Sequence, residues 1–226
     1  MAGPAPQDGY VLEAALREGA RSLGIALSKE AIRQFERYAL ELLRWRRAAN
    51  IAGFRTLDEV VARGFLESLA FLLVLPAEAV NVVDIGSGAG FPGLVLRIAN
   101  PGLRVTLIEA RRRRHSFLAH LCRLLGLGGV RCLLGRAEDL LVQEGLVGAF
   151  DAGLMRAVAG IEPAAKLAAG FLKTGGVLVT YQDGKPAGHP VPPAGYEALK
   201  AAAVEIEGRA CGLLLSYAKT GRGRFT

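Results

Sequence analysis

The sequence predicts an α/β fold with a mostly parallel sheet flanked by helices and preceded by an N-terminal helical extension. From residue 80 onward, short apolar segments alternate with longer segments of helical periodicity, which is the pattern of βαβ units in a parallel sheet. A glycine-rich turn at residues 86–93 follows the first apolar segment, as in folds that bind nucleotide cofactors. Apolar residues make up 51% of the 226 residues, so the chain can bury a large core.

Three helices are expected in the N-terminal part of the chain. Apolar residues recur at helical spacing over residues 9–24, Ser28 is suited to cap a second helix, and a third helix is expected over residues 57–76. We interpret residues 1–78 as a helical cap that packs on a core formed by residues 79–226, so that the whole chain is one compact unit.

The core is expected to contain seven strands with helices between them. Residues 183–193 contain too many glycines and prolines for regular structure and are predicted to form a loop beside the site. The sequence has no uncharged apolar run of about 18 residues and no pattern of a secretion signal, so we expect no membrane span and a cytoplasmic location. Strands are expected near residues 81–85, 104–108, 130–134, 151–155, 176–181, 204–208 and 212–218, and helices at about 92–100, 111–126, 137–144 and 160–172.

Residues 82–93 carry the clearest functional signal. Asp84 ends the first strand, and the glycines that follow it, Gly86, Gly88 and Gly90, permit positive φ angles and leave room for a ligand beside the backbone. The turn also fits the G-x-G-x-x-G pattern of dinucleotide-binding proteins, which hold an anionic pyrophosphate with bare amide groups. A carboxylate at Asp84 favours a cationic ligand instead. We therefore expect S-adenosylmethionine, which carries an ammonium and a sulfonium group.

Further cofactor contacts are expected where the next strands end. Glu109 ends the second strand, where a bound cofactor offers its ribose hydroxyl groups. Ala137 and Glu138 follow the third strand, where an adenine ring is expected, although Glu138 could equally complement the dipole of a helix N-terminus. The cofactor-binding residues that we expect are Asp84, Gly86, Ser87, Gly88, Gly90, Phe91, Glu109, Ala110, Ala137, Glu138 and Arg156.

Arg156 is the candidate catalytic residue. It follows the fourth strand, at the edge of the sheet where enzymes with this kind of cofactor hold the molecule that accepts the transferred group. In that place its guanidinium group would bind the acceptor. The alternative is a structural ion pair with Asp84, Glu138 or Asp151.

The charge of the chain indicates a polyanionic partner. The formal net charge is +7, and arginines cluster at residues 44–47, at residues 111–114 and near the C-terminus. Such clusters attract RNA, although each could also be an ordinary solvated surface. The three cysteines are widely spaced among apolar residues, and neither they nor the three histidines show metal-ligand spacing. We therefore assign no disulfide framework and no metal site.

Residues 84–94 resemble the cofactor loop of the RsmG (GidB) family of ribosomal RNA methyltransferases. The resemblance continues in the family's order through Glu109, residues 135–138 and residues 156–159, and it spans about residues 30–185. It implies a Rossmann-like class I methyltransferase fold, S-adenosylmethionine as cofactor, and methyl transfer to N7 of a guanine in small-subunit (16S) ribosomal RNA. Because guanine N7 carries no proton, this reaction needs no general base.

The resemblance also implies that the partner is ribosomal RNA or the small ribosomal subunit, bound by a monomer. The chain departs from the family at Gly64, where the family has a histidine, and at residues 183–184, where it has a lysine-glycine pair. Because these departures lie on the expected acceptor side, methyl transfer to a small molecule or protein, and RNA binding without catalysis, are the alternatives. The implied RNA contacts are Arg46, Asn50, Arg113, Arg156 and Lys185.

Overall fold

A computed structural model gives the structure of the chain. Asn50 and Lys185, two of the residues expected to contact RNA, lie outside the part that it describes. The described residues are 6–49, 51–143, 145–156, 160–184, 191–206 and 208–221.

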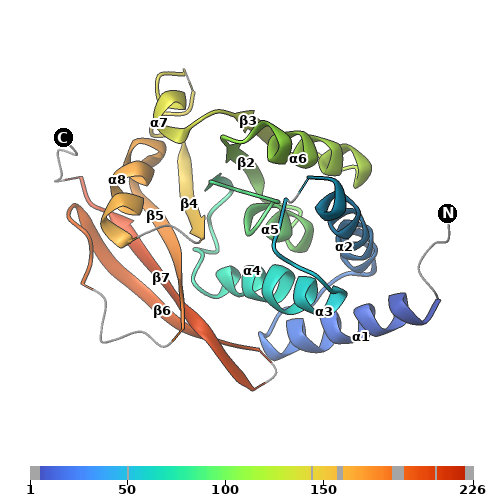
Figure 1. Cartoon of the computed structure of the whole chain (residues 1–226). Helices are drawn as coiled ribbons and strands as arrows, with labels where there is room; N and C mark the ends of the chain where they lie inside the picture. The colour runs from blue at the N-terminus through green and yellow to red at the C-terminus, as the bar shows by residue number, and fades with distance from the viewer. Residues whose placement is uncertain are drawn as a thin grey trace.

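A seven-stranded sheet forms the centre of the described structure, in the order β3-β2-β1-β4-β5-β7-β6 (Figure 1). Neighbouring strands from β3 to β5 are parallel, whereas β7 runs antiparallel to both β5 and β6. The prediction of a mostly parallel seven-stranded sheet is therefore confirmed. The strands are β1 (Asn81–Ile85), β2 (Arg104–Glu109), β3 (Val130–Leu134), β4 (Phe150–Arg156), β5 (Leu172–Asp183), β6 (Tyr196–Ile206) and β7 (Arg209–Lys219).

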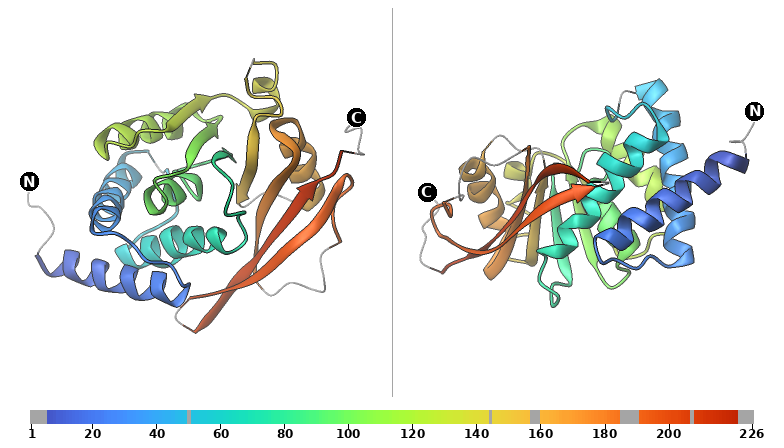
Figure 2. Two further views of the ribbon diagram at one scale, coloured as in Figure 1. Left: turned by 180° about the vertical axis from the view of Figure 1, so that it is seen from behind. Right: turned by 90° about the horizontal axis from the view of Figure 1, so that it is seen from below.

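Helices cover both faces of this sheet. Side chains alternate between the two faces of a strand, so Val82 belongs to the hydrophobic cluster on one face and Val83 to the cluster on the other. The first cluster contains residues of α5, α6 and the N-terminal helices, and the second contains residues of α8, which lies across the sheet from those helices (Figure 2). The helices are α5 (Gly93–Ala99), α6 (Arg112–Leu124), α7 (Ala137–Leu140) and α8 (Ile161–Phe171).

The N-terminal part of the chain is helical, as predicted. The hydroxyl oxygen of Ser28 accepts a hydrogen bond from the amide of Ala31 at 3.0 Å, which confirms it as the cap of the second helix. The third helix is not a regular α-helix, because a π-helical segment widens its centre. The elements are α1 (Pro6–Ser22), α2 (Lys29–Ala49), α3 (Leu57–Glu59), the π-helix η1 (Val60–Leu66), α4 (Glu67–Leu69) and the 3-10 helix η2 (Ala70–Leu73).

Strand β6 is longer than the sequence predicts, since it begins at Tyr196 rather than near residue 204. It lies at the edge of the sheet and pairs only with β7 among the described strands. Its first half is exposed and contains Glu197 and Lys200, so it lacks the apolar alternation by which a buried strand is recognised. Charged side chains on an exposed edge strand also oppose pairing with other chains.

Tyr38 of α2 ties the helical cap to the glycine-rich turn. Its side chain is completely buried, and its hydroxyl group donates a hydrogen bond of 2.6 Å to the carbonyl oxygen of Ala89. Its ring stacks on Phe91, with 5.5 Å between the ring centroids. Because both contacts are made across the junction of cap and core, the cap fixes the backbone of the turn.

We expect Tyr38→Phe to lower the free energy of unfolding by about 1–3 kcal/mol, because the buried carbonyl of Ala89 would lose its donor. Urea unfolding followed by circular dichroism measures this loss. Tyr217→Phe is the matched control, since the buried Tyr217 hydroxyl has no hydrogen-bond partner in the part of the chain that the structure describes, and its removal should cost nothing. Equal stability of the Tyr38→Phe variant and the wild type would show that the bond does not hold the turn.

Candidate functional site

A cavity of about 360 Å3 lies beyond the carboxyl ends of β1, β4 and β5. This is the edge of a parallel sheet at which ligands bind in α/β folds. Both the cap and the core contribute to its walls. The lining residues are Ile51, Ala52, Gly53, Phe54, Arg63, Glu67, Gly86, Ser87, Gly88, Ala89, Phe91, Arg114, Arg156 and Asp183.

The glycine-rich turn forms one wall of the cavity. Gly86, Gly88 and Gly90 all have positive φ angles, of 78°, 59° and 102°, as the sequence predicts. Gly86 and Gly88 line the cavity, and a Cβ atom on either would meet no atom closer than 3.9 Å. Gly90 does not line it, and a Cβ atom there would lie 2.5 Å from the Tyr38 hydroxyl oxygen. The turn thus needs a glycine at residue 90 for packing against the cap.

Asp84 lies beneath the turn and is only 1% exposed. Its Oδ2 atom accepts a hydrogen bond of 2.8 Å from the amide of Gly93, the first residue of α5. Its Oδ1 atom is buried and has no hydrogen-bond partner among the described residues. Burial raises the pKa of the Asp84 carboxyl to about 7, against the opposing effect of the Gly93 hydrogen bond. The carboxyl group does not line the cavity. It lies behind the turn, so its effect on a ligand in the cavity is electrostatic and not a direct contact.

Glu109 also holds the turn. It is 5% exposed, and its carboxylate accepts hydrogen bonds from the amides of Gly88 at 2.9 Å and Arg111 at 2.7 Å. A carboxylate can accept further hydrogen bonds, so these contacts leave it able to bind hydroxyl groups. Four more of the expected cofactor-binding residues lie outside the cavity lining: Glu109 itself, Ala110, and the two expected near an adenine ring, Ala137 and Glu138. Glu138 is exposed in the first turn of α7.

Arg156 reaches across the cavity mouth to the cap. One guanidinium nitrogen donates to the Ser68 hydroxyl at 3.3 Å, and the other donates to the carbonyl of Arg63 at 2.6 Å and to the Glu67 carboxylate. The guanidinium carbon also lies 5.6 Å from the centroid of the Tyr181 ring. Arg156 thus makes a structural ion pair, which is the expected alternative, but the expected partners Asp84, Glu138 and Asp151 are wrong. The partner is Glu67, and Asp151 pairs with Lys173 at 2.6 Å.

Glu67 is the buried partner of this ion pair. It is 7% exposed, and burial raises the pKa of its carboxyl group, while the charge of Arg156 opposes that rise. Neither Glu67 nor the aromatic residue Phe54 was expected in the site. Their place in the cavity depends on how the cap folds onto the sheet, which no local sequence pattern reveals.

Arg114, and not Arg113, lies in the cavity wall. Arg113 is exposed, whereas Arg114 is half-buried and shares the helix face of Phe117 and Leu118, which are completely buried. Because Arg114 precedes these two apolar residues by three and four positions, helical spacing could have predicted from the sequence that it faces inward. Arg46 donates to the carbonyl of Arg55 at 3.4 Å and does not line the cavity. RNA contacts at Arg46 and Arg113 therefore stay predictions.

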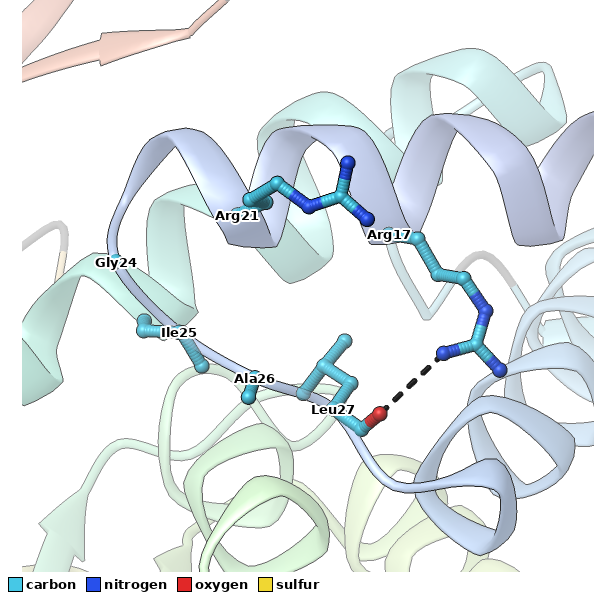
Figure 3. Close-up of a pocket in the computed structure, with 6 residues that line it drawn as sticks. All are labelled: Arg17, Arg21, Gly24, Ile25, Ala26 and Leu27. Atoms are coloured by element: carbon cyan, nitrogen blue, oxygen red, sulfur yellow. Dashed lines mark hydrogen bonds between the residues drawn. The ribbon is translucent and has the colours of Figure 1, made fainter.

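A second hollow, of about 330 Å3, lies beside the turn between α1 and α2 (Figure 3). Arg17 donates to the carbonyl of Leu27 there at 3.3 Å and pairs with Glu13 at 2.7 Å. None of the expected site residues lines this hollow. Its two arginines, Arg17 and Arg21, lie in the second half of α1, next to the turn that follows the helix. Within the described part of the chain, no helix is long and apolar enough to cross a membrane, and no group of His, Cys, Asp and Glu side chains could hold a metal ion.

Solved structures with the same fold include MtNAS in complex with MTA and tNA, which is 16% identical, with a TM-score of 0.55 over 95% of this chain and 78% of that one. The cyclase SpnF is 17% identical, with a TM-score of 0.55 over 87% of this chain and 97% of its own. At these identities the likeness shows the fold alone. The predicted Rossmann-like α/β fold, with a mostly parallel seven-stranded sheet flanked by helices, is confirmed.

Sequence relatives carry a more specific relationship. The ribosomal RNA small subunit methyltransferase G of Moorella thermoacetica is 35% identical over 188 residues, which are 83% of this chain and 75% of that protein. The protein of the same name from Streptococcus thermophilus is 39% identical over 176 residues, 77% of this chain and 71% of its own. Residues 31–188 also match the model of the GidB family, described as rRNA small subunit methyltransferase G. The chain therefore belongs to the rRNA small subunit methyltransferase G (GidB) family.

Proposed function

We propose that this protein transfers a methyl group from S-adenosylmethionine to N7 of a guanine in small-subunit (16S) ribosomal RNA. One observation carries the proposal: every residue that lines the cavity falls within residues 31–188, the segment that matches the family. The relatives in that family are named for methylation of the ribosomal RNA of the small subunit. The partner would be that RNA or the small subunit itself, and a cytoplasmic monomer would carry out the reaction.

The residues around the turn fit S-adenosylmethionine. Gly86 and Gly88 present open backbone to the cavity, and Glu109 can accept hydrogen bonds from ribose hydroxyl groups. When the Asp84 carboxyl group is deprotonated, it places a negative charge behind the turn, and its Oδ1 atom has no hydrogen-bond partner among the described residues. This charge suits a cationic cofactor and opposes a pyrophosphate. When bound, the cofactor supplies a methyl group made electrophilic by the positive charge on its sulfur.

The side chains in the cavity would act by binding and orienting the acceptor. Guanine N7 has a lone pair in the plane of the base and no proton, so no residue has to remove one. Arg156 is held by Glu67, Ser68 and the carbonyl of Arg63, and a guanidinium group fixed in this way can bind an acceptor without further ordering. Phe54 and Phe91, which meet edge to face at 5.5 Å, give the cavity an apolar wall that excludes water.

A methyl-transfer assay tests the proposal. The protein is incubated with tritiated S-adenosylmethionine and small ribosomal subunits that lack the modification, and the label is mapped by borohydride and aniline cleavage at N7-methylguanine. We expect label at one guanine of the 16S RNA. Label in a protein or small molecule would indicate a different acceptor, and RNA binding without label would indicate a non-catalytic relative.

We expect loss of Arg156 to lower kcat/KM for RNA by about 100-fold, because a fixed donor to the acceptor is removed. Removing Arg156 alone would leave the buried Glu67 unpaired and cost about 3–5 kcal/mol of stability. The variant to measure is therefore the double substitution Arg156→Met with Glu67→Gln, which removes both charges at similar volume. Arg156 was also expected to bind the cofactor, but its hydrogen bonds go to the cap, so calorimetry should show an unchanged Kd for S-adenosylmethionine. Full activity, or loss of cofactor binding, would refute the role in acceptor binding.

We expect the affinity for S-adenosylmethionine to rise as the pH increases from 6 to 8. The pKa of Asp84 is about 7, so its carboxyl group loses its proton over this interval, and the carboxylate form attracts a cation. The affinity should change by about tenfold for each unit by which the bound cofactor lowers that pKa. Calorimetry at several pH values measures this, with Asp84→Asn as the comparison. The same pH dependence in both proteins would exclude Asp84 as its source.

A further inference from the structure

We propose that Arg63 and Arg114 form a phosphate clamp that binds the RNA backbone at the acceptor nucleotide. The inference rests on the proposed function, because it takes the acceptor to be RNA. It assigns backbone binding to Arg63 and to Arg114 of the arginine cluster at residues 111–114, neither of which is among the RNA contacts that the sequence predicts, and it leaves Arg156 to bind the reacting base.

The two arginines come from different parts of the chain and line one cavity. Arg63 lies in the π-helical segment η1 of the cap, and Arg114 lies in the first turn of α6 in the core. Because cap and core each supply one arginine, a strand of RNA entering the cavity could contact both. Arginine suits this role since its planar guanidinium group donates two parallel hydrogen bonds to phosphate oxygens.

The charges in the cavity leave these two arginines available. Five charged residues line it: Arg63, Arg114, Arg156, Glu67 and Asp183. Arg156 forms an ion pair with Glu67, and the charge of Arg63 also acts on the Glu67 carboxyl group and opposes the rise of its pKa, without a hydrogen bond between them. Neither Arg63 nor Arg114 makes a side-chain hydrogen bond or ion pair to any residue in the described ranges, so two guanidinium groups face a single further carboxylate, that of Asp183. Three guanidinium groups and two carboxylates among the lining side chains leave one positive charge, whereas the carboxyl group of Asp84 lies behind the glycine-rich turn. We therefore expect a phosphate at the arginines of η1 and α6 and not at the turn.

The backbones that carry these arginines are fixed, although their side chains are not. The carbonyl oxygen of Arg63 accepts the 2.6 Å hydrogen bond from Arg156, which anchors the π-helical segment at the cavity. Arg114 stands one turn before Phe117 and Leu118, whose complete burial fixes α6 against the core. Because the two backbones are anchored, only the two arginine side chains have to be ordered when an anion binds.

The salt dependence of RNA binding tests the clamp. Binding of a fluorescent 16S RNA transcript is measured by anisotropy at several KCl concentrations, and log K is plotted against log salt. We expect Arg63→Gln and Arg114→Gln each to reduce the slope by about 0.7 to 1, the value for one lost phosphate contact. Arg63→Lys and Arg114→Lys, which keep the charge, should retain the slope. The Kd for S-adenosylmethionine should not change.

Arg123→Gln is the matched control. Arg123 lies on the same helix as Arg114 but is exposed in its last turn, so its removal changes the net charge equally and should leave the slope unchanged. If the slopes of the Arg63→Gln and Arg114→Gln variants equal that of Arg123→Gln, the clamp is wrong, even if the wild type methylates RNA. Loss of cofactor affinity in either variant would indicate a structural role and also overturn it.

The methyl-transfer assay on the same proteins separates this inference from the proposed function. Reduced slopes in both variants, with no methyl transfer by the wild type, would support the clamp and contradict the methyltransferase proposal. Methyl transfer by the wild type with unchanged slopes in the variants would support the methyltransferase proposal and contradict the clamp. A wild type that does not bind the transcript would overturn the clamp.

Discussion

The buried hydrogen bond from Tyr38 to the carbonyl of Ala89 is the contact on which the site depends most. It joins the second helix of the cap to the turn that follows β1. The hydroxyl oxygen that makes it would lie 2.5 Å from a Cβ atom at residue 90, so no side chain fits there. A buried carbonyl needs a donor, and here the donor comes from the cap rather than from the sheet. The shape of the turn therefore depends on contacts from the cap as well as on contacts from the sheet.

The ion pair of Arg156 and Glu67 makes a second connection between the same two parts. It lies at the cavity itself, where the cap contributes Glu67 and the sheet contributes Arg156. A single hydrophobic cluster also contains residues of α1, α2, η1 and the sheet, so the cap and the strands bury one another's apolar surface. The division at residue 78 stays a prediction, but the cavity requires residues from both sides of it.

Two buried acidic residues, Asp84 and Glu109, support the backbone of the site. Asp84 and Glu109 accept hydrogen bonds from amides of the turn and of the helix start that follows it. Such bonds stabilise a carboxylate, whereas burial destabilises it, and for Asp84 burial has the larger effect. The same carboxyl group thus supports the turn and stays responsive to a nearby positive charge.

The sequence by itself determined the parallel sheet, the glycine-rich turn and the family, because βαβ alternation and glycine spacing are local patterns. It did not reveal that Gly90 packs on Tyr38 or that Arg156 pairs with Glu67. The early start of β6 was also missed, since its exposed half is held by backbone pairing with β7. Only the tertiary structure decided these features, because each depends on a contact between residues that the chain brings together from different elements.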